Sequence, residues 1–248
     1  VPADEFGMRI AGIGGTGVVT VTQTLATAAL LDGRFVRGLD QTGLAQKGGA
    51  VHLHLRLANA PEDISAIRVA VGEADCIIGG DLVVTGGAKT IGLMTKGRTG
   101  AVVNDHEIVT GDFTRNRDFQ IPADRLRLSL EARLNEKVAF FDASTLALRL
   151  LGDSIYSNML VLGAAWQQGL LPLTEAAILK AIELNGAKVA ENQRAFQIGR
   201  WAMLHADAAA EVIRGPVADD QPVDPVEDRA ARLVEYQDQA LADRFRKL

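Results

Sequence analysis

Gly12-Ile13-Gly14-Gly15-Thr16-Gly17 separates an apolar stretch, Met8 to Ile13, from a long helix-forming segment that begins near Val18. Glycine accepts the tight backbone turn and lets a ligand or a neighbouring chain approach the main chain. The run therefore predicts the first strand-to-helix turn of a nucleotide-binding type of fold. We expect a strand over Met8 to Ile13 and a helix over Val18 to Leu31, ended by Asp32-Gly33.

The segments that follow continue an alternation of strands and helices. Further strands are expected at 35–39, 51–57, 75–79, 99–104 and 138–141, and those at 75–79 and 138–141 are apolar enough to be buried. Right-handed crossovers then place the strands in one mainly parallel, Rossmann-like α/β sheet with helices on both faces. Residues 51–57 alternate apolar and polar side chains, which predicts a strand with unlike faces near an edge of the sheet or a partner.

The C-terminal part of the chain has no strand pattern. Helices are expected at 143–151, 157–168, 174–184 and 187–204, with Thr174 as the N-cap of the third. We divide the chain into a domain at 1–214, a Pro- and Asp-rich linker at 215–227 and a C-terminal helix at 228–248. One face of that helix would carry Val234, Leu241, Phe245 and Leu248. Because the chain opens almost directly into its first strand and does not begin with methionine, we expect a piece of a longer polypeptide.

The composition excludes several classes of partner and site. With 248 residues, 48% of them hydrophobic, the chain can form one large domain or a domain with an appendage. A formal net charge of -5 predicts no nucleic-acid and no anionic membrane partner. The single cysteine, Cys76, excludes an intramolecular disulfide framework or a cysteine-rich metal site and favours a cytoplasmic location. No apolar run is long enough for a membrane helix, and the N-terminus lacks signal-peptide features.

The glycine run has a cofactor interpretation and a structural one. Gly12, Gly14 and Gly17 fit the dinucleotide fingerprint, and Asp40 ends the second strand, where an acidic residue would bind a ribose hydroxyl. A stand-alone NAD(P)-binding reductase is therefore one alternative. The same glycines also suit any close strand-to-helix turn, and the loop after Asp40 is more elaborate than that of an ordinary dehydrogenase.

Other reactive side chains are few. His52 and His54 share one face of a strand and could place two imidazoles on a metal, but no third ligand is evident, so hydrogen-bonded structural histidines are favoured. Cys76 lies on an apolar strand without a base, which favours packing over nucleophilic chemistry. Lys47 in its glycine-rich loop is either a phosphate or carboxylate ligand or a solvated lysine. We therefore expect no catalytic residue and no metal site in this chain.

Three stretches together closely resemble the gamma-type domain of 2-oxoacid:ferredoxin oxidoreductases, namely Gly12 to Thr20, Thr42 to Val51 and Ile182 to Gly186. Within that superfamily the chain is most similar to the large fused indolepyruvate ferredoxin oxidoreductases. The resemblance covers residues 8 to 205 and also includes Leu151 to Ser154, Asn158, Gly169 to Pro172, Asn192, Arg194 to Phe196, Gly199 and Arg200. The long loop motif is much more specific than the glycine turn.

The resemblance implies an auxiliary role in a larger oxidoreductase. In such enzymes a thiamine-diphosphate domain decarboxylates the 2-oxoacid, iron-sulfur clusters pass electrons to ferredoxin, and coenzyme A commonly takes the acyl group. This chain has neither a four-cysteine cluster motif nor a thiamine signature. It would pack beside catalytic and iron-sulfur domains of an enzyme for indolepyruvate or another aryl pyruvate, help to form the active site or coenzyme A pocket, and be inactive alone.

The resemblance also selects the residues that would face that shared site. They are Gly14, Gly15, Thr16, Thr42, Gln46, Lys47, Gly48 and Gly49. Related gamma subunits often carry Arg-Gly-Gly where this chain has Lys47-Gly48-Gly49, so bidentate recognition by an arginine is not expected here. Two alternatives remain beside the reductase: an adenylating enzyme, which would need a reactive cysteine, and a purely structural role in assembly.

Overall fold

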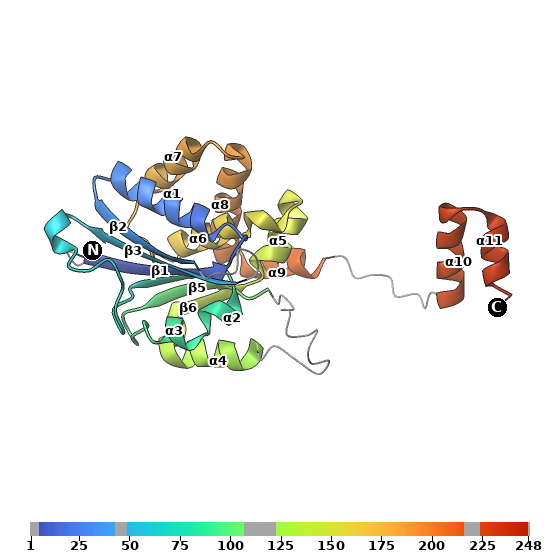
Figure 1. The fold of residues 1–248 in the computed structure, drawn as a ribbon, viewed down its shortest axis with the longest axis horizontal. Coiled ribbons are helices and arrows are strands. Elements are labelled where there is room, and N and C mark those ends of the chain that lie inside the picture. The colour runs from blue at the N-terminus through green and yellow to red at the C-terminus, as the bar shows by residue number, and fades with distance from the viewer. Residues whose placement is uncertain (1–4, 43–48, 107–122, 216–223, 248) are drawn as a thin grey trace. The chain divides into compact units, whose positions relative to one another are not determined.

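The computed structural model describes residues 5–42, 49–106, 123–215 and 224–247 and divides into two compact units, Val1–Ile213 and Arg214–Leu248. The first unit is built on one six-stranded sheet in the order β2-β3-β1-β4-β5-β6 (Figure 1). Its strands are β1 Glu5–Ile13, β2 Phe35–Thr42, β3 Ala50–Ala58, β4 Cys76–Gly79, β5 Gly100–Asn104 and β6 Val138–Phe141. Only β3 among these strands is antiparallel to the others, which confirms the predicted mainly parallel α/β sheet.

Strand β3 is the second strand from the β2 edge of the sheet, which confirms the prediction of a strand near an edge. Its antiparallel pairing with both β2 and β1 was not predicted. Its faces are unlike in chemistry, as predicted, but polar His54 and Arg56 are as buried as apolar Leu53 and Leu55. The prediction that 138–141 is a buried strand is wrong, because β6 forms an edge of the sheet and only Phe141 in it is buried.

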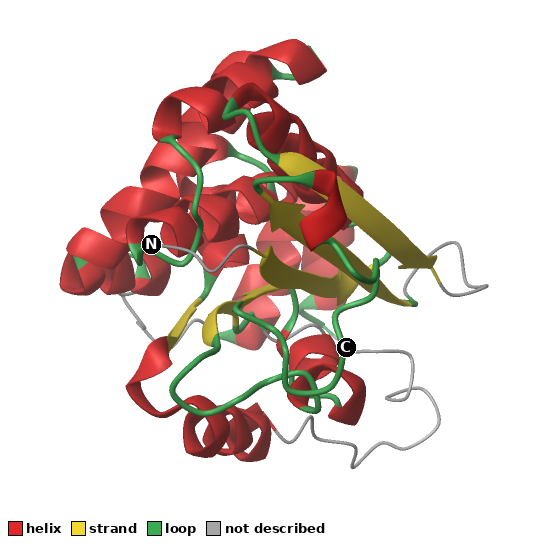
Figure 2. Cartoon of the chain, turned by 90° about the vertical axis from the view of Figure 1, so that its left-hand side faces the viewer, coloured by secondary structure: helices red, strands yellow, loops and turns green. Residues whose placement is uncertain are grey.

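Helices cover both faces of the sheet (Figure 1 and Figure 2). One face carries α1 Val18–Leu31, α6 Ser157–Gln167, α7 Glu175–Asn185 and α8 Val189–Leu204, and the other carries α2 Leu82–Thr85, α3 Ala88–Ile91 and α4 Ala123–Leu134. The remaining helices of this unit are α5 Ala143–Leu151 and α9 Ala206–Arg214. The predicted bounds of α1 are confirmed, Thr174 caps α7 through a bond from Ala177 N, and α9 was not predicted.

The two faces of the sheet have separate apolar cores. The larger core lies under α1, α6 and α8 and includes Leu25, Leu53 and Phe196, while the smaller lies under α2 and α4. Helices α6 and α8 cross with their backbones in contact, because a Cβ atom at Gly163 would overlap the Phe196 carbonyl oxygen, and one at Gly199 that of Leu160. This contact requires glycine on both helices.

The second unit contains two helices rather than the single helix expected at 228–248. Helix α10 Pro225–Tyr236 begins inside the predicted linker 215–227, because the Asp224 side chain accepts from Val226 N and proline suits the first helical turn. Helix α11 Gln239–Phe245 starts anew, because Asp238 caps it through Leu241 N. The expected single apolar stripe is therefore split between two helices. No helix in the described ranges is long and apolar enough to cross a membrane.

Candidate functional site

A polar cavity of about 390 Å³ lies at the carboxyl ends of β1, β4 and β5. From β1 the chain passes to β2 and β3 on one side of it and then to β4, β5 and β6 on the other side, so the direction of the connections reverses between β1 and β4. Open α/β sheets bind ligands at such a reversal. The cavity is lined by Gly15, Thr16, Gly80, Asn104, His106, Ser144, Asp153, Ser154, Ile155 and Ser157.

The glycine turn forms one wall of this cavity and is held from two sides. Gly15 and Gly17 have φ values of 91° and 83°, which explains why the turn needs glycine. The Asn158 side chain of α6 donates to the Thr16 carbonyl oxygen, and Gly14 N donates to the Gly49 carbonyl oxygen at 2.8 Å. The turn is therefore joined to the start of β3. The N-cap residue of α1 is Gly17, which has no side chain to cap the helix, so the N–H groups of the first turn can bind an anionic or polar ligand.

Asn104 is the buried hydrogen-bonding centre of the opposite wall. Its side chain is 2% exposed. Its Oδ1 accepts from Ala143 N at 3.0 Å, and its Nδ2 donates to Gly80 O at 3.2 Å and to Ser144 Oγ at 2.9 Å. One amide thus ties the ends of β4 and β5 to the start of α5. Asn104 was not among the predicted site residues, because nothing in the local pattern brings its partners together.

A histidine and a carboxylate lie beside Asn104. His106 Nδ1 is 3.1 Å from the Asp142 carboxylate, which also accepts from the Thr145 N–H at 2.7 Å and the Thr145 hydroxyl at 2.6 Å. Burial by itself raises the pKa of Asp142, but the bonds from Thr145 and His106 outweigh it and hold the pKa below its usual value. With Nδ1 held by Asp142, Nε2 of His106 is the ring nitrogen left for a ligand in the cavity.

The structure describes five of the eight expected site residues. Gly14, Gly15, Thr16 and Gly49 come together at this edge of the sheet. Thr42 is the last residue of β2, where its backbone pairs with Val51. Gln46, Lys47 and Gly48 lie outside the described residues, so their place in the site stays a prediction.

The structure argues against two other interpretations of the sequence, the dinucleotide-binding reductase and the adenylating enzyme. Asp40 lies in β2, and the inserted β3 separates it from β1, whereas a ribose-binding acid belongs on the strand next to the glycine turn. This argues against the dinucleotide alternative. Cys76 is fully buried, and burial raises the pKa of its thiol, which confirms the expected packing role and argues against an adenylating enzyme.

The paired histidines are not part of the cavity. His54 is fully buried and accepts a hydrogen bond from Val69 N at 3.2 Å, which confirms a structural, hydrogen-bonded histidine. Nδ1 of His52 is buried and has no hydrogen-bond partner among the described residues, so that expectation fails for His52. Within the described part of the chain, no three His, Cys, Asp or Glu side chains gather as metal ligands.

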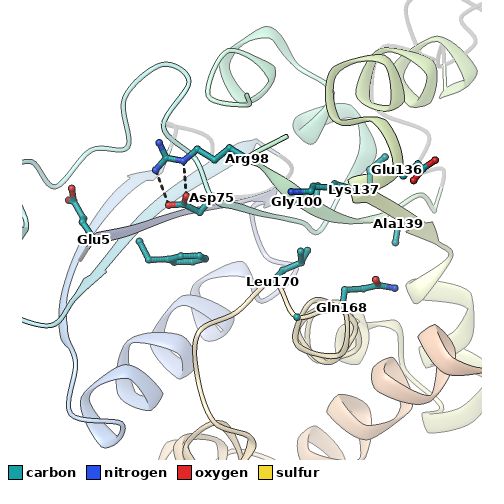
Figure 3. A pocket seen from close by; sticks show the side chains of 13 residues that line it. Glu5, Asp75, Arg98, Gly100, Glu136, Lys137, Ala139, Gln168 and Leu170 are labelled. Atoms are coloured by element: carbon teal, nitrogen blue, oxygen red, sulfur yellow. Dashed lines mark hydrogen bonds and ion pairs between the residues drawn. The ribbon is translucent and has the colours of Figure 1, made fainter. Parts of the chain in front are cut away.

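A larger cavity of about 610 Å³ lies at the amino ends of β1, β5 and β6 (Figure 3). Both of its cations bond to the protein itself: Arg98 donates to Asp75 at 2.7 and 3.2 Å, and Lys137 donates to the Gly97 carbonyl oxygen at 2.6 Å. The smaller cavity is the better candidate site despite its size, because it adjoins the glycine turn and the reversal of strand order.

Comparison with known proteins identifies the family. Residues 7–202 match the pyruvate ferredoxin/flavodoxin oxidoreductase family. The chain belongs to this family. It is a gamma-type component of a 2-oxoacid:ferredoxin oxidoreductase, homologous to IorB, a subunit of indolepyruvate oxidoreductase.

The relatives of this gamma-type chain match it over most of its length. Indolepyruvate oxidoreductase subunit IorB of Thermococcus kodakarensis is 29% identical over 197 residues, which are 79% of this chain and 94% of IorB. The common gamma subunit of the pyruvate/ketoisovalerate oxidoreductases of Pyrococcus furiosus is 28% identical over 157 residues, which are 63% of this chain and 74% of that subunit.

Solved structures share the fold. Pyruvate oxidoreductase subunit PORC of Thermotoga maritima matches with a TM-score of 0.56 and 21% identity, covering 80% of the gamma-type chain and 97% of PORC. The 2-oxoglutarate:ferredoxin oxidoreductase of Magnetococcus marinus, solved with 2-oxoglutarate, coenzyme A and succinyl-CoA, matches with a TM-score of 0.58 and 18% identity. That match covers 82% of this chain and 32% of the larger protein.

Replacing Asn104 by alanine is expected to lower the free energy of unfolding by about 2 kcal/mol, because Ala143 N and the Gly80 carbonyl oxygen lose their buried partner. Urea unfolding followed by circular dichroism measures the change. Asn192→Ala on α8 is the matched control, since that amide makes a single exposed bond to the Ala187 carbonyl oxygen. Equal losses in the two variants would contradict the central position of Asn104.

Proposed function

We propose that this chain is the gamma-type domain of an indolepyruvate or aryl pyruvate:ferredoxin oxidoreductase, and that it contributes to assembly and to the active-site or coenzyme A pocket. The supporting observation is the polar cavity whose glycine turn is bonded through Gly14 N to Gly49, at the end of the Thr42 to Gly49 loop. The IorB relatives support the indolepyruvate assignment.

The chain's own groups suit one part of a shared site. The first-turn N–H groups of α1, the Thr16 and Ser154 hydroxyls and the ammonium of Lys47 are donors that fit a phosphate or the polar arm of coenzyme A. Coenzyme A would supply the thiol that accepts the acyl group. Thiamine diphosphate and the iron-sulfur clusters belong to partner domains or subunits, and ferredoxin is reached through them. The isolated chain is then inactive, and the assembly is cytoplasmic.

Lys47→Ala in the assembled enzyme is expected to raise the apparent KM for coenzyme A about tenfold, the effect of losing one charge-assisted hydrogen bond, while the KM for the 2-oxoacid changes little. Steady-state ferredoxin reduction with indolepyruvate, pyruvate and 2-oxoglutarate measures both constants and the substrate preference. Lys188→Ala, at an exposed position before α8, is the control. Unchanged turnover and coenzyme A dependence would favour a purely structural role.

Calorimetry separates this proposal from the dinucleotide alternative. The isolated chain is expected to release no heat of binding with NAD or NADP. Saturable binding of either nucleotide, abolished by Asp40→Ala, would favour the reductase instead.

A further inference from the structure

The face of β1, β2 and β3 opposite α1 is basic. Arg9 of β1 pairs in register with His54 of β3, and Arg56 of β3 pairs with Arg37 of β2, so these side chains share one face. The segment between β3 and β4 crosses this face, where Val69 N binds His54 and the Arg68 carbonyl oxygen binds Arg56. We use the term basic strip for Arg9, Arg37, His52, His54, Arg68 and Lys89.

Arg9 is buried, and no carboxylate of the described residues pairs with it. Its side chain is 2% exposed, and its Nε atom is buried and has no hydrogen-bond partner among the described residues. Its Nη1 atom lies 3.2 Å from His54 Nε2. Because His54 Nδ1 accepts from Val69 N, the neutral ring carries its hydrogen on Nε2, so Arg9 meets a second donor instead of an acceptor. A buried guanidinium in this position lacks the counter-charge that buried cations normally have.

The neighbours of Arg9 add positive charge. Burial first, and then the charge of Arg68, lower the pKa of Arg9 to about 10. Burial, Arg9 and Lys89 lower the pKa of His52 to about 4. None of Arg9, Arg37, Arg68 and Lys89 has an ion pair with a carboxylate of the described ranges.

The nearby carboxylates of Glu5 and Glu73 pair with Arg56 rather than with Arg9. Glu5 lies 3.0 Å and Glu73 2.6 Å from Arg56, so these two carboxylates neutralise Arg56 near the amino end of β1. The positive charge that remains is accessible from outside the domain, because Arg37, Arg68 and Lys89 are exposed and β2 is an edge strand. The described fold therefore presents an uncompensated cationic surface beside a free sheet edge.

We propose that the basic strip docks on an acidic surface of a neighbouring subunit or domain of the same oxidoreductase, whose Asp or Glu side chains pair with the exposed Arg37, Arg68 and Lys89 and so offset the positive charge around buried Arg9. The inference rests on the proposed function, because it assumes an assembly. Charge complementarity favours an acidic partner, because each exposed cation of the strip adds electrostatic attraction to an acidic surface. Within the complex, the strip also loses solvent, which strengthens each pair.

Cross-linking in the intact complex tests the contact directly. The complex is isolated through a tag on this chain, and a water-soluble carbodiimide activates carboxylates so that an adjacent lysine amine forms an amide with loss of water. Mass spectrometry is expected to find Lys89 joined to an Asp or Glu of a different subunit or domain. A Lys89 that stays uncoupled, or that couples to a second copy or to residues of this same domain, would overturn the proposal.

Charge reversal tests the energetics. The double variant Arg37→Glu, Lys89→Glu is expected to weaken association with the partner about tenfold or more at low salt and to reduce the salt dependence of binding. Lys188→Glu changes an exposed cation that directly precedes α8 on the opposite face of the sheet; it is the matched control and is expected to change association less than about twofold. Equal effects of the two changes would overturn the proposal.

A third variant separates docking from a structural role of Arg9. Arg9→Met keeps the length of the side chain and removes the charge, so the isolated chain is expected to keep or raise its melting temperature while association weakens. A lower melting temperature with unchanged association would make Arg9 purely structural. If the wild-type chain binds no thiamine-containing partner at all, the proposed function fails. If the wild-type chain binds such a partner but the variants behave like their control, only the docking proposal fails.

Discussion

Replacing Gly199 by alanine is expected to destabilise the first unit by about 3 kcal/mol or more. The added Cβ would overlap the Leu160 carbonyl oxygen, and because that atom belongs to the backbone of α6, it cannot rotate away. Helices α6 and α8 would have to separate and open the larger core around Phe196. In an ordinary helix interior the same change stabilises a protein by up to roughly 1 kcal/mol, so the expected effect has the opposite sign.

Guanidinium unfolding measures this change. Gly163→Ala is expected to be as severe, because its Cβ would overlap the Phe196 carbonyl oxygen in the same crossing. Since either substitution forces the helices apart, their combined effect should be smaller than the sum of the two. Arg194→Ala, at an exposed position of α8, is the control and should change stability by less than about 0.5 kcal/mol. A stabilising Gly199→Ala would show that the backbones of α6 and α8 are not in contact.

Acid is expected to destabilise the first unit steeply between pH 6.5 and pH 4, because His52 and His54 stay neutral in the folded state. Burial, and then the charge of Arg9, lower the pKa of each from 6.5 to about 4. In this window the unfolded chain binds more protons than the folded one, so stability is present above pH 6.5 and is lost as the pH falls. For fully buried His54 the loss is on the order of 3 kcal/mol.

Denaturant titrations at a series of pH values measure this loss. His54→Asn is expected to reduce the slope, because an amide can still accept from Val69 N but does not titrate. Burial raises the pKa of Asp81, which opposes the effect in the lowest part of the range, and Asp142, whose pKa is lowered, adds to the loss only at lower pH. NMR titration of the histidine rings gives an independent measurement. Stability that stays constant from pH 6.5 to pH 4.5 would contradict neutral, buried histidines.

The local elements of the fold could be predicted well. Helix α1 has the predicted bounds because the glycine turn precedes it and Asp32-Gly33 follows it, and each signal acts on the backbone within a few residues. The apolar run at β4 was correctly assigned to the interior. The predicted single helix at 228–248 was wrong, because apolar periodicity does not reveal a cap such as Asp238, which starts α11.

The candidate site could be predicted only in part. The glycine turn was recognised because its chemistry is contained in one short run. Asn104, His106 and Asp142 were not, because β5, β6 and α5 bring them together only when the sheet forms. Asn158 was included in the resemblance, but its bond to the Thr16 carbonyl oxygen spans 142 positions and has no local signal.

The alternation of strands and helices, the tight turn at Gly12 to Gly17 and the family resemblance can be read from the local sequence, because backbone preference and apolar periodicity act over neighbouring residues. The strand order cannot be read in this way. The insertion of β3 between β2 and β1 depends on hydrogen bonds between segments distant in the chain. That one pairing moves Asp40 away from the glycine turn and buries Arg9 and His54 together, and neither outcome follows from local pattern.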